Sequence, residues 1–441
     1  MALLVALLII ATSVYLMVRR VEVRLVLLAA GLLMAGVVGR PLAIADTFTQ
    51  AMVAAMVAPI CASMGFAAVL DATGCDRHLV NLLMAPLRRA RWAVLPGGIV
   101  AAYLVNLAVP SQASTAAALG PVSVPLMAAV GIRPDVAGAA LVLGASFGGD
   151  LLNPGAQDVQ ALAGATGLPA RAISARIRPA SLVGVLAAAI TFTLRNRRLG
   201  PSIGGEPGPV AASPVGTPAQ SPRLNPVKAI IPLVPVLLLL LAYTGWPPLA
   251  WLLRPPPGDQ WRPLAGALPV VRAMLIGTLL AAALSWREVQ RVIRDLFEGM
   301  GAAYGNIISL TIAAQCFGAG IAAIGLGEVL LKMLGGYPWA LAALAIGFPW
   351  ALAALSGSGS GSVLAFAQTF LAPLGILPHS VLLGVLACLA AGFGRTMSPV
   401  SAVVIYGSGL VGVSPLALVA RLLPALLAGA AMALVTALLL G

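Results

Sequence analysis

Charged side chains are scarce in this sequence. Asp, Glu, Lys and Arg make up 9% of its 441 residues, and 60% of the residues are hydrophobic. Ordinary soluble domains carry about 25% charged residues, so the composition indicates a polytopic membrane protein embedded in a lipid bilayer. The net charge is +13, but the basic residues form short clusters between apolar runs, such as Arg19-Arg20 and Arg88-Arg89. Because clusters of this kind set membrane topology, we expect no nucleic-acid partner.

Residues for metal binding and catalysis are scarce as well. The two histidines, His78 and His379, lie far apart, and the four cysteines form no CxxC pair. We therefore expect no transition-metal site and no other cofactor. No GxxxxGK[ST] phosphate-binding loop is present, so ATP is not expected to drive the protein directly. Ser358 or Ser360 would be the best nucleophile of an enzyme, but neither histidine is near them, and we predict that the protein is not an enzyme.

One polar stretch interrupts the apolar sequence near its C-terminal end. Residues 356–362 read SGSGSGS, between apolar runs at 337–355 and 363–374. Each glycine costs a helix roughly 1 kcal/mol relative to alanine, and non-helical backbone at membrane depth is tolerated only where it is buried in protein or lines a cavity. We predict a re-entrant hairpin over 337–375. The residues expected to bind a polar solute at its tip are Ser356, Ser358, Ser360 and Ser362. Close helix packing by small residues is the alternative interpretation.

The two halves of the chain match at a fixed spacing of 245 residues. Pairs at this repeat spacing include Ser111 and Ser356, Pro154 and Pro399, Arg176 and Arg421, and Gly184 and Gly429. Arginines and prolines that recur together indicate an internal duplication. We predict a first repeat over 1–198, a flexible cytoplasmic linker over 199–226 that is rich in Pro, Gly and Ser, and a second repeat over 227–441.

The predicted fold is all-α, with about ten transmembrane helices and two re-entrant hairpins. Residues 47–70, for example, are expected to form one membrane span. Each repeat then holds five crossing helices and one hairpin. Because five is odd, the second repeat must be inverted relative to the first, as in many secondary carriers. The basic clusters place both termini on the periplasmic side.

The first repeat is predicted to contain its own hairpin over 92–130. Four polar residues at its tip are candidates for solute binding: Ser111, Gln112, Ser114 and Thr115.

Two crossing helices, 136–165 and 379–410, are predicted to be broken. They contain GASFGGDLLNP at 144–154 and GFGRTMSP at 392–399. Proline removes a helical hydrogen bond and glycines let the chain unwind, which exposes N–H groups that favour a carboxylate or phosphate. The solute-binding candidates in these breaks are Asn153, Arg395, Thr396 and Ser398.

Three charges fall within the broken helices: Asp150, Asp158 and Arg395. A charge at the centre of a membrane helix costs about 2.5–3.5 kcal/mol on insertion scales and marks function by default. Arg395 offers a planar fork for a carboxylate. Asp150 and Asp158 are candidates for coupling to an ion, by accepting a proton or binding Na⁺ near the hairpin tips. Alternatively, Arg395 pairs with an aspartate to hold the half-helices together, and both interpretations hold if solute displaces the pair.

The stretch 394–401, GRTMSPVS, resembles the GRTLSPVS signature of the DcuC-type anaerobic C4-dicarboxylate carriers of the ion transporter superfamily. Supporting similarities are Gly65–Ala68, Leu107–Val109, and Pro154 followed by Asp158. The similarity runs from about Leu25 to the C-terminus.

The resemblance implies a scaffold domain and a moving, elevator-like transport domain within a homodimer in the bacterial inner membrane. It implies secondary transport of fumarate, succinate or malate by alternating access, as a symporter or antiporter that takes up, exports or exchanges its solute with Na⁺ or H⁺ as coupling ion. A carrier of amino acids or other organic carboxylates is the alternative. A passive anion channel fits less well, because duplicated chains with broken helices suit alternating access.

Overall fold

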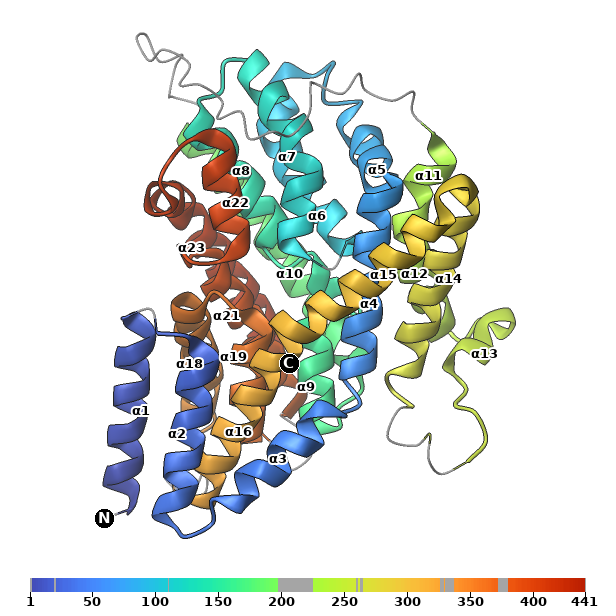
Figure 1. Cartoon of the computed structure of the whole chain (residues 1–441). Helices are drawn as coiled ribbons and strands as arrows, with labels where there is room; N and C mark the ends of the chain where they lie inside the picture. The colour runs from blue at the N-terminus through green and yellow to red at the C-terminus, as the bar shows by residue number, and fades with distance from the viewer. Residues whose placement is uncertain are drawn as a thin grey trace.

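Every regular element in the described part of the chain is a helix (Figure 1). The computed structural model describes residues 2–19, 21–109, 111–196, 225–258, 261, 265–325, 329, 337–371 and 380–440. The predicted linker 199–226 lies outside these residues except for its last two positions, and the predicted hairpin 337–375 is described as far as Leu371.

The first half of the chain contains α1 (Ala2–Val18), α2 (Val23–Val37), α3 (Leu42–Met52), α4 (Val57–Thr73), α5 (Cys75–Met84), α6 (Val94–Ala108), α7 (Gln112–Ala129), α8 (Pro134–Ser146), α9 (Gln157–Thr166) and α10 (Ala170–Asn196). The second half contains α11 (Pro226–Ile230), α12 (Val234–Tyr243), α13 (Ala250–Leu253), α14 (Leu268–Leu284), α15 (Val289–Ala303), α16 (Ser309–Ala323), α18 (Pro338–Ser356), α19 (Gly359–Phe366), α21 (Ser380–Thr396), α22 (Ala402–Val411) and α23 (Pro415–Leu440).

Several of these helices can cross a membrane. Within the described residues, six helical stretches are long and apolar enough to do so, or seven if the bent pair α3 and α4 is counted as one span. Further apolar helices have 10–17 residues, so the number ten stays a prediction. The predicted span over 47–70 corresponds to α3 and α4, which are bent by 47° at the break between them. Pro59 accounts for the bend, because in an unbroken helix its ring would clash with the carbonyl of Ala55 and it has no N–H to donate.

Two pairs of adjacent helices are joined by serine-capped turns. In the first pair, α6 and α7, Ser111 has an extended backbone and its Oγ accepts a hydrogen bond from the N–H of Ser114 at 3.3 Å. In the second pair, α18 ends at Gly357 in the left-handed region (φ 72°), and Ser358 Oγ accepts from the N–H of Gly361 at 3.3 Å. The repeat spacing pairs Ser111 with Ser356, whereas the capping serine of the second turn is Ser358, so the equivalence of the two halves shifts at the tips.

The two breaks lie where glycine and proline predicted them. α8 ends at Ser146 and α9 begins at Gln157, with a 3₁₀ turn at Asp150–Leu152 between them. α21 ends at Thr396 and α22 begins at Ala402. The first residues of α9 and α22 are therefore partners at the repeat spacing. Both helices have ten residues and end at left-handed glycines, Gly167 and Gly412.

The long helices that follow the breaks, α10 and α23, also begin at positions that the repeat spacing pairs. They cross at Gly184 and Gly429. A Cβ on Gly184 would lie 2.9 Å from the carbonyl oxygen of Gly429, and a Cβ on Gly429 would lie 2.6 Å from the carbonyl oxygen of Gly184. Only glycine permits this approach at either position.

α15 and α16 form one continuous helical stretch through a π-helical turn at Tyr304–Ile308. In Figure 1, α15 runs obliquely across α4 and α16 descends beside α2 and α3. Gly65 of α4 makes the crossing close, since a Cβ there would lie 2.8 Å from side-chain carbons of Leu296 and Met300. α16 also packs against α19, which brings it next to the serine–glycine tip.

Candidate functional site

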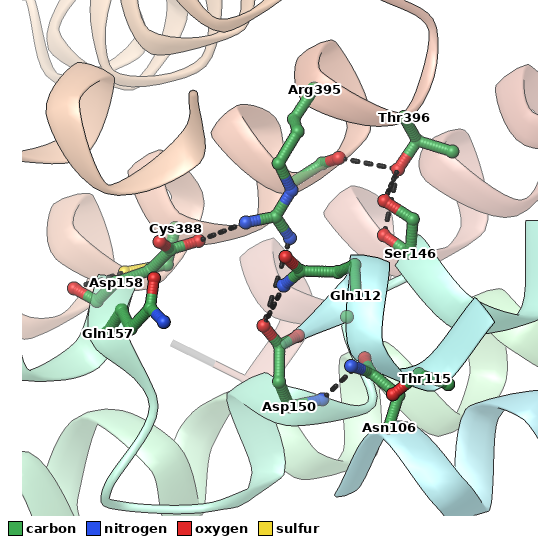
Figure 2. A network of polar contacts seen from close by, with 12 residues as sticks. Asn106, Gln112, Thr115, Ser146, Asp150, Gln157, Asp158, Cys388, Arg395 and Thr396 are labelled. Carbon is green, nitrogen blue, oxygen red and sulfur yellow. Dashed lines mark hydrogen bonds and ion pairs between the residues drawn. The ribbon is translucent and has the colours of Figure 1, made fainter. Parts of the chain in front are cut away.

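The two breaks bring the three charges of the sequence prediction together (Figure 2). Nη1 of Arg395 lies 3.3 Å from Oδ2 of Asp158, and Nη2 of Arg395 lies 3.8 Å from Oδ2 of Asp150. The exposed fraction of the side chain is 9% for Arg395, 1% for Asp158 and 5% for Asp150. Arg395 lies in the last turn of α21, where the helix dipole favours a positive charge. The structure therefore places both aspartates against the same guanidinium, while their roles in solute binding and ion coupling stay predictions.

Burial makes these charges depend on one another. Removing one partner of a buried ion pair typically costs about 3–5 kcal/mol, because the remaining charge is left uncompensated. With one arginine and two aspartates, the charges sum to +1 − 2 = −1 when both carboxyls are ionised.

The tip of the α6–α7 hairpin is fastened to the first break. Gln112 Nε2 donates to Oδ2 of Asp150 in a short hydrogen bond, and Asn106 Oδ1 accepts from the backbone N–H of Asp150 at 3.0 Å. Asn153 Nδ2 donates to the carbonyl of Leu107 at 3.4 Å. Figure 2 shows Gln112 lying between Arg395 and Asp150. The sequence prediction missed Asn106, although an asparagine in the otherwise apolar stretch 94–108 could have identified it.

The three glycines of the serine–glycine run contact three different neighbours. Gly357 caps α18, and a Cβ there would lie 3.0 Å from the Cα of Ser401. A Cβ on Gly359 would lie 2.7 Å from Nη1 of Arg395 and 2.8 Å from Oδ2 of Asp158. On Gly361 it would lie 3.1 Å from Cδ2 of Leu310 in α16. The alternation therefore lets one tip approach a backbone, an ion pair and a neighbouring helix at once.

The serines of the run divide into those that build the turn and one that does not. Ser356 Oγ accepts from the N–H of Ser358, Ser358 Oγ caps α19, and Ser362 Oγ donates to the carbonyl of Ser358. Ser360 is buried, and its hydroxyl makes no hydrogen bond to any residue that the structure describes. Ser356 and Ser358 use their hydroxyls as acceptors in these bonds, so each still has an O–H to donate, and solute binding by the four serines stays a prediction.

The other predicted binding residues are mostly engaged within the protein. Ser114 Oγ donates to Ser111 Oγ, and Thr115 Oγ1 donates to the carbonyl of Val109. Thr396 Oγ1 lies 2.9 Å from Ser146 Oγ and donates to the carbonyl of Gly392. These contacts join the hairpin to itself and α21 to α8.

Several buried polar atoms at the centre have no hydrogen-bond partner within the described residues. They are Nε and Nη2 of Arg395, Oδ1 of Asp150 and Oγ of Ser398. Buried polar groups are nearly always hydrogen-bonded, so this group of donors and acceptors is where a bound solute would find partners. No trio of His, Cys, Asp and Glu suited to a metal ion occurs among the described residues.

Fold and site together define a multi-pass membrane transporter. The sequence profile of the family described as "Tripartite ATP-independent periplasmic transporter, DctM component" matches residues 3–348, and the chain belongs to this family. The resemblance to DcuC-type carriers is confirmed in part, since DcuC proteins are among its relatives, although the matching family is DctM.

Relatives of known sequence agree with this assignment. An uncharacterized transporter of Haemophilus influenzae is 36% identical over 130 residues, which is 29% of this chain and 90% of that protein. The probable anaerobic C4-dicarboxylate transporter DcuC of Vibrio cholerae is 26% identical over 370 residues, 81% of this chain and 76% of that protein. DcuC of Escherichia coli K12 is 26% identical over 372 residues, which is 81% of this chain and 75% of that protein.

Two solved structures share the fold. Neisseria gonorrhoeae MtrF, described as belonging to a class of antimetabolite efflux pumps, aligns with a TM-score of 0.60 at 15% identity over 89% of this chain and 82% of that one. The Alcanivorax borkumensis YdaH transporter aligns with a TM-score of 0.56 at 18% identity, over 90% of this chain and 87% of that one.

Proposed function

We propose that this protein is a secondary active transporter of C4-dicarboxylates of the fumarate, succinate and malate type. The observation that carries the proposal is Arg395, a buried guanidinium at the end of an apolar helix whose Nε and Nη2 have no hydrogen-bond partner among the described residues. Its planar donors match a carboxylate. The DcuC relatives, which are C4-dicarboxylate transporters by description, support this solute class.

We infer that transport proceeds by alternating access between two inverted repeats. The first residues of α9 and α22, and those of α10 and α23, are partners at the repeat spacing, which supports a duplication. Asp150 and Arg395 are equivalent at this spacing and face each other, and the equivalent Gly184 and Gly429 touch. Equivalent residues in mutual contact are expected where a two-fold axis relates two repeats.

An elevator-like movement is proposed on the same basis. Both hairpin tips and both breaks meet at one buried ion-pair network, which disfavours their separation. These elements would therefore move as one transport domain against a scaffold that includes α16. Periplasmic termini and a homodimer are further proposals.

The charges of the site support ion coupling. The site sums to −1 with both aspartates ionised, and a dianion brings the total to −1 − 2 = −3. So many uncompensated charges are too costly away from water, and we propose that Na⁺ or H⁺ enters with the solute at Asp150 or Asp158. An amino acid or another organic carboxylate is the alternative solute class, since Arg395 would bind any carboxylate.

Uptake by the purified protein in liposomes tests the proposal. Labelled succinate would be offered under an inward Na⁺ gradient, an inward H⁺ gradient or neither, with protein-free liposomes as the control. We expect saturable accumulation above equilibrium under one gradient, with competition by fumarate and malate. Uptake that only equilibrates the solute and ignores both gradients would indicate a channel, and no saturable uptake of any of the three would reject the solute class.

A further inference from the structure

The unpartnered atoms of the charged centre are of two opposite kinds. Nε and Nη2 of Arg395 are donors, whereas Oδ1 of Asp150 is an acceptor. They are close to each other, because Nη2 lies 3.8 Å from the other carboxylate oxygen of Asp150. A solute that satisfies all of them needs a carboxylate and a hydrogen-bond donor side by side.

The geometry of Arg395 leaves one edge of its guanidinium available. Nη1 pairs with Asp158, and the backbone of Gly359 packs closely against it. Nε and Nη2 point their hydrogens along a common edge, which can bind the two oxygens of one carboxylate in parallel. The carboxylate of the solute is therefore assigned to this edge.

Asp150 is held so that only one of its oxygens is available. Oδ2 accepts from Gln112 and faces Arg395, and the backbone N–H of Asp150 donates to Asn106. Oδ1 is buried without a partner among the described residues. An ionised carboxylate oxygen can only accept hydrogen bonds, so its partner must bring a proton.

We propose that the transporter prefers C4-dicarboxylates that carry an ammonium or hydroxyl group on the carbon next to one carboxylate, with the carboxylate on Arg395 and the donor on Oδ1 of Asp150. This inference rests on the proposed function and narrows its substrate class. Fumarate and succinate have no such donor. An ammonium group fits better than a hydroxyl, because it also offsets the negative charge of the two aspartates.

Binding measured in lipid nanodiscs tests the preference. L-aspartate, L-malate, succinate, fumarate and L-alanine are titrated against the wild-type protein and against Asp150→Asn. Asp46→Asn serves as the matched control, since Asp46 is exposed on α3. A hydrogen bond to a charged group supports a preference of about tenfold or more for aspartate over succinate, with malate in between.

In Asp150→Asn the preference for aspartate over succinate should disappear, because the amide has lost the charge that attracts the ammonium group. Malate should lose less, since the amide oxygen still accepts from a hydroxyl. The control should retain the wild-type ranking. A size-exclusion profile identical to the wild-type profile establishes that the variant is folded, and the ranking within the wild-type protein tests the proposal without any variant.

The possible outcomes distinguish the preference for a donor group from the assignment of C4-dicarboxylates as the solute class. Succinate or fumarate binding as tightly as aspartate to the wild-type protein overturns the preference and leaves the C4-dicarboxylate assignment standing. Binding of alanine without binding of any C4-dicarboxylate overturns the assignment and supports recognition of a donor next to a carboxylate. Binding of none of the five overturns both.

Discussion

Asp150 and Arg395 stand 245 residues apart, at equivalent positions of the two halves of the chain, and Nη2 of the arginine lies 3.8 Å from Oδ2 of the aspartate. The same position thus carries opposite charges in the two halves, and these charges meet in the interior. Asp158 adds a second carboxylate, 3.3 Å from Nη1. Its counterpart at the same spacing, Val403, is apolar. The two halves therefore contribute chemically different residues to the site at matching positions.

Gly359→Ala should impair transport by disturbing this centre. Its Cβ would lie within 3 Å of Nη1 of Arg395 and of Oδ2 of Asp158, so the ion pair must shift. Loss of one charge-assisted hydrogen bond is worth about 1.5–3 kcal/mol, and we expect the initial uptake rate in liposomes to fall about tenfold or more. Gly347→Ala in α18 is the control, since nothing lies within 4 Å of its Cβ, and it should transport normally. Equal rates for both variants would contradict the close approach of the tip to the ion pair.

Substitutions at Ser358 and Ser360 should have different effects, the first on the stability of the protein and the second on solute binding. Ser358→Ala removes the N-cap of α19 and should destabilise the protein by about 1 kcal/mol, detected as a lower thermal unfolding temperature. Ser360→Ala removes a hydroxyl that makes no hydrogen bond to a described residue. We expect its unfolding temperature to be unchanged and its KM for uptake to be several-fold higher. Wild-type uptake by a stable Ser360→Ala protein would remove Ser360 from the site.

The buried carboxyl of Asp76 should make the stability of the folded protein depend on pH. Asp76 lies in the first turn of α5, outside the apolar spans, and burial raises the pKa of its carboxyl from 3.8 to about 7, with Asp71 adding to the rise and Arg77 opposing it. Because the pKa is higher in the folded state, the stability that Asp76 contributes is present below about pH 4 and is lost as the pH rises through 7. The change is on the order of a few kcal/mol.

Asp76→Asn should remove this dependence. We expect its unfolding temperature to fall less than that of the wild-type protein between pH 5 and pH 8. Burial lowers the pKa of the nearby His78, which acts in the opposite direction and is common to both proteins. Parallel curves for the wild-type protein and the variant would contradict the assignment to Asp76.

Much of the architecture follows from local chemistry that the sequence displays. Pro154 and Pro399, with their neighbouring glycines, marked both breaks, and the serine–glycine run marked a turn between packed helices. The bend before α4 was missed because Pro59 lies in the following helix rather than at the bend itself. A proline acts on the carbonyl four residues earlier, so its position does not coincide with its effect.

The charged residues of the site could be predicted from the sequence, but the contacts that each of them makes could not. Asp150, Asp158 and Arg395 stood out because charges are rare in apolar helices. Which aspartate contacts which nitrogen depends on how the two breaks pack, and the sequence carries no local signal of that. The roles of the serines were equally hidden, since a capping serine and one with a free hydroxyl look alike in an alternating run.

If Arg395 binds the carboxylate of the transported solute, a change at Arg395 should slow uptake more than the same change at another arginine that pairs with an aspartate. Arg395→Lys keeps the charge but loses the planar two-donor edge. Arg421→Lys makes the same change in α23, where Arg421 pairs with Asp135. With both proteins folded in liposomes, we expect Arg395→Lys to take up labelled succinate and aspartate at least about tenfold more slowly than the wild-type protein, and Arg421→Lys to retain wild-type rates. Wild-type uptake by a folded Arg395→Lys protein would contradict carboxylate binding by Arg395.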